Sequence, residues 1–381
     1  MERWKTITEG KTKLIVPVKG GFGKTKRGKE KKAPVFYNPQ MKLNRDLCCS
    51  LIRVLSEGRE LIFLDLLAGS GAKGLRVANE TDCEVYLNDA NPDSYAVIQK
   101  NAKLNDLDVE IFNEDANRLL QENCNAFDFI DIDPFGTPMP FLDNATMTLR
   151  RDGYMGVTAT DTAPLCGVYP GACFRKYGAR PLRSEFCHEV GLRILIGNIA
   201  RTSAKYSKGL ECLLSHYMGH YFRTYVRLLE GREKANRTLK ELGYLYYCGK
   251  CLNREYKKET LPSKKECSCG SKFEISGPLW LGKLGNKNLY KRVLMESRYL
   301  ENRALDKLLS MMIDEEGPPF YYDTHHVARI FGIKLRPIDE IIEDLKTRGF
   351  KASRTHFSPT SVKTNARIED VIKAFSRWSV R

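Results

Sequence analysis

The sequence predicts an α/β fold with a largely parallel sheet, followed by a smaller C-terminal α+β region. Short apolar runs alternate with helical patterns through more than half of the chain, which is typical of parallel strands joined by crossover helices. A glycine-rich turn with G-x-G-x-x-G spacing, Gly69 to Gly74, follows the first run. The pattern changes after about Gly231, where a cysteine-rich segment begins. The predicted strands are 61–67, 83–87, 108–112, 127–132 and 153–160.

The composition favours a nucleic-acid partner. The chain has 381 residues, with 62 Lys and Arg against 47 Asp and Glu, a formal net charge of +15. Such an excess suits a polyanion, although a solvated basic surface would have the same composition. No apolar run is long enough to span a bilayer, and the first residues lack the apolar core of a signal peptide. We therefore expect a cytoplasmic, monomeric protein with no membrane partner, whose twelve cysteines are mostly reduced or metal-bound.

The first 32 residues are strongly basic, with eleven Lys and Arg and three Glu. Residues 20–29 read as a basic loop, for which phosphate contact and simple solvation are equally good interpretations. Alternation of apolar and polar residues over 6–18 indicates a hairpin strand. A helix is expected from a cap at Asn44 to about Leu55. Arg45 falls in its first turn, where a cation opposes the helix dipole, which suggests an acidic partner such as the carboxylate of a bound ligand. A surface arginine is the alternative, and it is the better interpretation of the residue taken alone.

The glycine turn comes directly after a short buried strand that contains Asp65. Gly69, Ser70 and Gly71 form the tight turn that a bound nucleotide approaches closely. A dinucleotide places a pyrophosphate at such a helix N-terminus, and the carboxylate of Asp65 would repel it. The carboxylate suits a ligand with a cationic end, such as the amino group and sulfonium of S-adenosylmethionine. The stretch resembles the first motif of the class I methyltransferases, whose fold is Rossmann-like.

Two further acids follow the next strands. Asp89 ends the second strand and lies 24 residues after Asp65, the position of an acid that accepts from ribose hydroxyls. Asp115, followed by Ala116, ends the third strand and could accept from an adenine amino group. Each acid alone would also suit a helix cap or a turn. Because ligands bind at the carboxyl ends of strands in open α/β sheets, the three acids together predict a cofactor site.

The fourth strand ends at Asp133-Pro134-Phe135-Gly136, the most informative tetrapeptide of the chain. Methyltransferases of exocyclic amino groups carry a similar motif there. An aniline-like nitrogen is a poor nucleophile, and Asp133 with the Pro134 carbonyl could accept its two N–H groups and free its lone pair. An aromatic ring can stack on an extruded base, a role open to Phe135 or Phe141. The aromatic residue stands one place early, so the match is partial, and an Asp-Pro turn is the alternative.

The sheet is expected to close with a hairpin of 210–217 and 220–229, after a basic loop at 176–183 and a helix over 185–200. That helix carries Cys187-His188, which we interpret as packing, because methyl transfer by this route needs no nucleophile.

Four cysteines near the start of the C-terminal region form two close pairs, Cys248-x2-Cys251 and Cys267-x-Cys269. Such spacing predicts a structural zinc site, with a disulfide or a vestigial knuckle as alternatives. Residues 287–312 are expected to be helical. Two short helices, 323–330 and 337–345, then precede a hairpin of 350–357 and 362–365, which predicts a winged-helix-like unit. Its basic wing favours nucleic acid over protein as the partner.

Taken together, the chain resembles the archaeal and eukaryotic tRNA (guanine-26-N2) dimethyltransferases over nearly its whole length. The stretches that carry the resemblance are 36–46, 65–74, 131–136, 160–170 and 175–179. The resemblance implies S-adenosylmethionine as methyl donor and the exocyclic amine of one tRNA guanine as acceptor, methylated twice. It also implies a methyltransferase domain over 1–240, with the basic arm, and a tRNA-binding domain over 241–381.

The resemblance further implies residue roles. Arg45 would hold the methionine carboxylate, with Asp89 on ribose and Asp115 on adenine, while Lys73 or Arg76 would touch the cofactor. Asp133 would orient the amine. Spacing alone leaves open a monomethylating enzyme on another RNA or DNA base, and a nucleic-acid-binding module with a degenerate methyltransferase fold. An oxidoreductase conflicts with the acid before the glycine turn.

Overall fold

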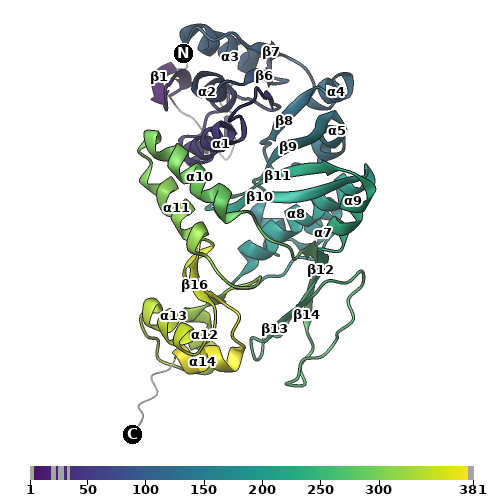
Figure 1. The fold of residues 1–381 in the computed structure, drawn as a ribbon, viewed down its shortest axis with the longest axis vertical. Helices are drawn as coiled ribbons and strands as arrows, with labels where there is room; N and C mark the ends of the chain where they lie inside the picture. The colour runs from purple at the N-terminus through teal and green to yellow at the C-terminus, as the bar shows by residue number, and fades with distance from the viewer. Residues whose placement is uncertain (1–3, 19–22, 25–29, 32–34, 376–381) are drawn as a thin grey trace.

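The computed structural model describes residues 4–18, 23–24, 30–31 and 35–375. The basic loop predicted at 20–29 lies almost entirely outside the described residues. The chain forms a methyltransferase-like α/β layer structure at one end and small α+β units at the other (Figure 1). No helix in the described part of the chain combines the length and the apolar character that crossing a membrane requires.

The central sheet has seven strands in the order β10-β11-β9-β8-β5-β6-β7. Its parallel part joins β9, β8, β5, β6 and β7, and an antiparallel hairpin of β10 and β11 extends it beside β9. All five predicted parallel strands and the closing hairpin are confirmed. The strands are β5 (Ile62–Asp65), β6 (Glu84–Asn88), β7 (Glu110–Phe112), β8 (Phe127–Ile132), β9 (Leu149–Ala159), β10 (Lys208–Met218) and β11 (Tyr221–Glu230).

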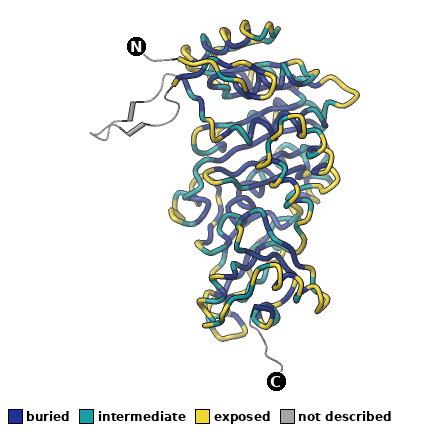
Figure 2. The backbone as a smooth tube through the Cα atoms, turned by 90° about the vertical axis from the view of Figure 1, so that its left-hand side faces the viewer, coloured by how far each residue is buried: buried dark blue, intermediate teal, exposed yellow. Residues whose placement is uncertain are grey.

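Helices cover both faces of this sheet because its strands are apolar on both sides. Along β5, Leu64 belongs to the core with α4, α5 and α8, whereas Phe63 belongs to the core with α1, α2 and α3. Figure 2 shows the resulting buried centre and exposed rim. These helices are α1 (Lys42–Leu55), α2 (Ala72–Glu80), α3 (Pro92–Leu104), α4 (Ala116–Glu122), α5 (Leu142–Thr148), α6 (Thr162–Leu165), α7 (Pro170–Tyr177), α8 (Cys187–Lys205) and α9 (Arg232–Leu239).

Two local predictions were wrong. Asn44 does not cap the first helix: α1 starts at Lys42, and the preceding 3-10 turn is capped by Asn38, whose side chain accepts from the Gln40 N–H. The Pro-Gln pair after Asn38 begins the helical turn earlier than the apolar pattern indicates. Lys176 lies in helix α7 and not in a loop, since α7 ends only at the left-handed Gly178.

The N-terminal segment forms the predicted hairpin, β1 (Trp4–Glu9) with β2 (Thr12–Pro17), and a short pair, β3 (Gly23–Lys24) with β4 (Glu30–Lys31). Strand β2 packs against α3 and α2. Asn101 of α3 fixes β2 by accepting from the Ile15 N–H at 2.6 Å. At the turn between β1 and β2, the Lys11 N–H donates to Glu80 at the end of α2.

The C-terminal region begins with a three-stranded sheet, β13-β12-β14, which the sequence pattern did not predict. Its strands are β12 (Leu242–Tyr247), β13 (Arg254–Lys257) and β14 (Glu274–Trp280). Strand β14 packs on α8 of the first region, and helices α10 (Lys287–Glu296) and α11 (Arg303–Asp314) form a pair on α1. The two regions therefore share extensive contacts, and the boundary at residue 240 stays a prediction.

The predicted winged-helix elements are all present at the far end of the molecule (Figure 1). A three-stranded sheet, β15-β17-β16, packs with three helices. The elements are β15 (Tyr322–Asp323), α12 (Thr324–Phe331), α13 (Ile338–Thr347), β16 (Ala352–Thr355), β17 (Ser358–Thr364) and α14 (Ile368–Phe375). Asp323 caps α12 and accepts hydrogen bonds from Thr360, which joins the helix to the wing.

Candidate active site

The Asp133-Pro134-Phe135 segment leaves the carboxyl end of β8, beside the glycine turn. The Asp133 side chain is 20% exposed, and its carboxylate lies 2.6 Å from the Lys73 ammonium. Pro134 is buried. Phe135 is 63% exposed, with its ring edge-on to Phe36 at a centroid distance of 4.4 Å. The motif thus presents a carboxylate and an accessible aromatic ring at one edge of the sheet.

Lys73 connects Asp133 to a second, fully buried carboxylate. Its ammonium lies 2.5 Å from Asp131, which also pairs with the buried guanidinium of Arg223 on β11. Burial opposes ionisation of Asp133, but the charges of Lys73 and Arg223 outweigh it and hold the pKa of Asp133 below its usual value. The Asp133 carboxylate is therefore ionised at neutral pH and available as an acceptor. Sequence reasoning missed Arg223, because nothing in its strand marks it as a partner of Asp131.

The glycine turn has the backbone that its sequence predicts. Gly69 and Gly71 have φ of +56° and +77°, values in the left-handed region that other residues rarely adopt. Gly71 precedes the first residue of α2, and Ser70 is buried. Asp65 fixes the turn by accepting from the Gly74 N–H at 2.9 Å. Burial raises the pKa of Asp65 to about 7, an effect that the nearby Asp131 reinforces and Lys73 opposes.

The acids after the second and third strands lie on neighbouring strand ends of the same sheet. Asp89 accepts from the Gly69 N–H at 2.7 Å, which ties the end of β6 to the glycine turn. Asp115 caps α4 by accepting from two backbone N–H groups, and Ala116 is the buried first residue of that helix. The structure therefore brings Asp65 and Asp89 to the glycine turn and places Asp115 one strand further along. Their contacts to a cofactor stay predictions.

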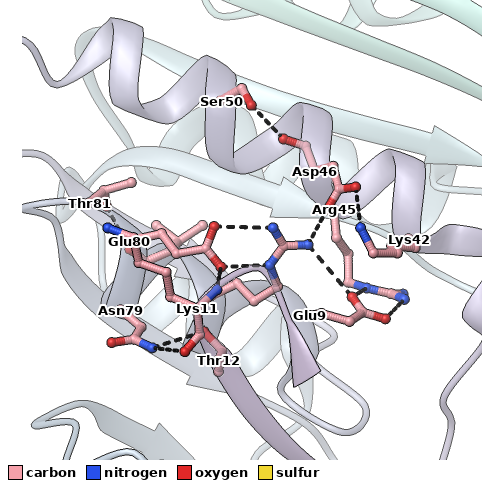
Figure 3. Close-up of polar contacts among 12 residues, drawn as sticks. Glu9, Lys11, Thr12, Lys42, Arg45, Asp46, Ser50, Asn79, Glu80 and Thr81 are labelled. Atoms are coloured by element: carbon pink, nitrogen blue, oxygen red, sulfur yellow. Dashed lines mark hydrogen bonds and ion pairs between the residues drawn. The ribbon is translucent and has the colours of Figure 1, made fainter. Parts of the chain in front are cut away.

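The acidic partner expected for Arg45 is Glu9, on β1 (Figure 3). The Nε and Nη2 atoms of Arg45 donate to the Glu9 carboxylate at 2.7 and 2.6 Å, and the Nη1 and Nη2 atoms donate to the Asn38 carbonyl at 3.2 Å. Arg76 is fully buried and pairs with Asp46 and with the Glu80 carboxylate one turn along α2. Arg76 therefore belongs to the contact between α1 and α2, while a contact of Arg45 with a methionine carboxylate stays a prediction.

The buried polar atoms without a hydrogen-bond partner among the described residues include both amide atoms of Asn44, the hydroxyls of Tyr221 and Tyr225, and the Nε atom of Arg223. Tyr221 lies on the same strand face as Arg223, and the charges of Asp133, Lys73 and Arg45 all act on its hydroxyl. Unpartnered buried polar groups are rare in proteins, and a buried water or a polar ligand can satisfy them. Together with the acids and the glycine turn, they fit the polar, cationic end of S-adenosylmethionine.

The four predicted zinc ligands converge. The Sγ atoms of Cys248, Cys251, Cys267 and Cys269 all lie within 4.8 Å of one another. The Cys248–Cys269 and Cys251–Cys267 pairs are 3.5 and 3.6 Å apart, and all four thiols are free. A tetrahedral zinc with ligands at about 2.3 Å requires sulfur atoms roughly 3.8 Å apart, so the four thiolates fit that ion. In the structure none of these four cysteines is joined in a disulfide.

The Cys187-His188 pair packs, as predicted. The His188 ring stacks on Tyr217 at a centroid distance of 3.9 Å, with the rings 11° from parallel. Burial lowers the pKa of His188, so the ring is neutral at physiological pH.

Three features define a class I S-adenosylmethionine-dependent methyltransferase. They are the order of the strands in the sheet, the glycine turn with acids at neighbouring strand ends, and the Asp-Pro motif at the end of β8. Comparison with known proteins assigns the family. The model of the N2,N2-dimethylguanosine tRNA methyltransferase family matches residues 11–376, and the chain belongs to this family.

Relatives and a solved structure agree with this assignment. The chain is 41% identical to the tRNA (guanine(26)-N(2))-dimethyltransferase of Pyrococcus abyssi over 390 residues, covering 97% of this chain and 98% of that protein. It is 42% identical to the enzyme of the same name from Methanobrevibacter smithii, covering 98% of both. The structure of Trm1 from Pyrococcus horikoshii with S-adenosyl-L-methionine superposes with a TM-score of 0.87 at 40% identity, covering 98% of this chain and 100% of that one.

Proposed function

We propose that this protein transfers two methyl groups from S-adenosylmethionine to the exocyclic N2 of guanine 26 in tRNA. The observation that carries the proposal is the ionised, half-buried carboxylate of Asp133 at the end of β8, beside the glycine turn and followed by Pro134 and an exposed Phe135. The bases of a tRNA can reach such an edge once they are unstacked. The family membership and the names of the relatives supply the base and its position.

The chemistry of the acceptor explains the motif. S-adenosylmethionine supplies an electrophilic methyl group on a sulfonium. The carboxylate of Asp133 would accept one N–H of the guanine amine and the carbonyl of Pro134 the other, which frees the nitrogen lone pair for in-line attack. As the N–C bond forms, the C–S bond would break, S-adenosylhomocysteine would leave, and the methylated nitrogen would release its proton to the Asp133 carboxylate and from there to solvent. Proline fixes the backbone so that its carbonyl keeps one direction. For the second transfer, the monomethylated amine rotates and presents its remaining N–H to Asp133. Phe135 stacks on the extruded guanine.

A bound S-adenosylmethionine would be held at the strand ends. Arg45 would pair with its methionine carboxylate, and Asp65, Gly69, Ser70, Gly71 and Lys73 would hold its amino-acid end. Asp89 would accept from the ribose, and Asp115 with Ala116 would contact the adenine. The support for these roles is the position of each residue at the carboxyl end of its strand, or at the start of the following helix.

The C-terminal region, residues 241–381, binds tRNA, and the region before it forms the methyltransferase domain with its basic arm. One zinc ion, held by Cys248, Cys251, Cys267 and Cys269, stabilises the start of the C-terminal region. Only a small apolar cluster, which includes Tyr246 and Phe273, surrounds these cysteines. A metal therefore supplies the stability that a core of this size lacks. The enzyme acts as a cytoplasmic monomer, as expected of a basic protein whose substrate is tRNA.

The test is methyl transfer from labelled S-adenosylmethionine to unmodified tRNA transcripts, followed by nucleoside analysis. We expect dimethylguanosine, and its loss when guanine 26 is replaced by adenine. Monomethylguanosine alone under excess enzyme would refute the second transfer. The variant Asp133→Asn should lose transfer by at least about 10³-fold, because it removes a charged acceptor in the transition state. It should keep its affinity for S-adenosylhomocysteine in calorimetry; a lost affinity would contradict the role assigned to Asp133.

A further inference from the structure

A groove of about 750 Å³ separates the helical pair α10–α11 from the winged-helix-like unit. It lies on the C-terminal half of the molecule, away from the β8 strand end that carries Asp133 (Figure 1). One wall comes from α10 and α11, and the other from α13 and β16. Its charged lining residues are Lys287, Lys291, Lys307, Lys346, Arg354, Asp314 and Glu316.

The cations of this groove are largely uncompensated. The four lysines are exposed and make no ion pair or side-chain hydrogen bond with any described residue, whereas Arg354 pairs with Asp339 at 2.9 Å. Asp314 and Glu316 are the acids in the lining, so the groove keeps an excess of positive charge. Lys287 and Lys291 are one helical turn apart, about 6 Å along the axis of α10, and point to the same side. Elsewhere on this surface, lysines such as Lys264 have acidic partners.

The groove is held in shape by contacts across its floor. The Glu316 N–H donates to the Ser353 hydroxyl at 2.7 Å, and that hydroxyl in turn lies 3.2 Å from the Glu316 carbonyl. Beneath it, the buried Lys363 pairs with Glu315 at 2.8 Å and with Glu189 of α8 at 3.1 Å. These contacts join the end of α11 to the wing and to the methyltransferase region. The helices and strands that carry the positive charges are therefore held in fixed positions, which limits the conformational entropy lost on binding.

We propose that this groove holds the sugar-phosphate backbone of the tRNA substrate, with Lys287, Lys291, Lys307 and Lys346 contacting phosphates. This inference rests on the proposed function and adds the surface that positions the RNA. A concave surface suits a strand of backbone better than a flat anionic bilayer does, and unpaired lysines on two facing walls suit phosphates on both sides of one strand. The contacts are independent of sequence. They therefore set affinity and register, while the catalytic edge selects the base.

The experiment measures tRNA affinity against salt for three forms of the full chain. The groove variant is K287Q/K291Q/K307Q/K346Q. The matched control, K100Q/K103Q/R232Q/K240Q, removes four exposed positive charges that make no ion pair among the described residues and lie on α3 or at the ends of α9. Wild type, groove variant and control are titrated with unmodified tRNA between 50 and 300 mM salt, and their unfolding temperatures are compared.

If the groove holds phosphates, the slope of log Kd against log salt falls in the groove variant by about 3 to 4, since each lost phosphate contact removes roughly 0.7 to 0.9. The control slope should fall by less than about 1, and kcat at saturating tRNA should stay within about twofold of wild type for both variants. Equal slopes in the two variants would overturn the inference.

The same data separate this inference from the proposed function. If the wild type binds tRNA through the groove but does not methylate it, the proposed function is refuted and the groove proposal is supported. If the wild type methylates guanine 26 but the groove variant binds tRNA like the control, only the groove proposal is refuted. Because the four lysines are exposed, unfolding temperatures that match wild type are expected for both variants.

Discussion

Removing the ammonium of Lys73 is the most direct test of the buried charge network at the catalytic edge. Lys73 lies 2.5 Å from Asp131 and 2.6 Å from Asp133, with only 7% of its side chain exposed. The substitution Lys73→Met keeps the volume of the side chain and deletes the charge. Asp131 then retains Arg223 as its partner, but Asp133 loses its nearest cation. Breaking a buried pair by removing one partner costs about 3–5 kcal/mol, because the remaining charge stays desolvated.

That loss is large enough to measure. For a chain of this length it corresponds to a fall of about 4–6 °C in the unfolding temperature. Its pH dependence follows from the direction of two pKa shifts. The pKa of Asp133 is lowered in the folded protein, so its contribution is present at neutral pH and is lost as the pH falls through the folded value. The pKa of Lys73 is raised, so its contribution is present below its unfolded value and lost only at strongly alkaline pH.

The destabilisation by Lys73→Met should therefore be greatest near pH 8 and shrink toward pH 5, where the unpaired Asp133 takes up a proton. The rate of methyl transfer should follow the same pH dependence, with activity shifted to higher pH, because a protonated carboxyl is a weaker hydrogen-bond acceptor for the N–H of the amine than a carboxylate. Thermal unfolding and transfer assays across pH 5–9 measure both. Asp133→Asn in the Lys73→Met background should restore stability without activity. A loss of stability that is the same at every pH would refute the electrostatic reasoning.

Three further predictions concern other parts of the chain. Metal analysis should find one zinc per chain, and a metal-free native protein would contradict the site. Cys267→Ser or a strong chelator should remove the zinc and expose the segment around it to proteolysis, while the affinity for S-adenosylhomocysteine stays unchanged. Burial, with help from the positive charges of His356 and Arg223, lowers the pKa of His216 to about 3. Stability should therefore fall as the pH drops below about 6.5, with a contribution of up to about 1.4 kcal/mol per pH unit that His216→Phe removes; identical pH–stability curves would refute this. Replacing the Lys and Arg residues of 19–32 by Gln, which keeps the β1–β2 hairpin, should weaken tRNA binding and flatten its salt dependence, and an unchanged slope would exclude a role of the basic arm in RNA contact.

The elements that the sequence predicted well are those whose residues obey a local rule. Each parallel strand is a short apolar run bounded by turn residues, and each predicted acid follows such a run. Asp65 and Asp89 therefore meet at the glycine turn, as expected of the carboxyl ends of adjacent parallel strands. The cysteine cluster was equally predictable, because four thiols in two close pairs leave few geometries other than a shared ion.

What the sequence could not predict are pairings across the chain. Glu9 meets Arg45 across 36 residues and Asp131 meets Arg223 across 92, and no periodicity links a charge to its partner. The expectation that Arg45 has an acidic partner was correct because it followed from the helix dipole, which is local, but the partner itself depends on how the β1–β2 hairpin packs. The sheet of β12, β13 and β14 was missed for a similar reason, since its strands pair around the cysteine loop.

The buried charges explain why a cationic cofactor suits this edge of the sheet. Three carboxylates, Asp65, Asp131 and Asp133, face two cations, Lys73 and Arg223, so full ionisation would leave one excess negative charge in a buried setting. The protein relieves that excess at Asp65, whose pKa is raised to about 7 by burial and by the neighbouring acid. A sulfonium or ammonium group placed beside the glycine turn supplies the missing positive charge and favours the ionised form of Asp65. A pyrophosphate there would add charge of the wrong sign. The same acid that distinguishes this glycine turn in the sequence thus selects the class of ligand through the charge balance of the whole network.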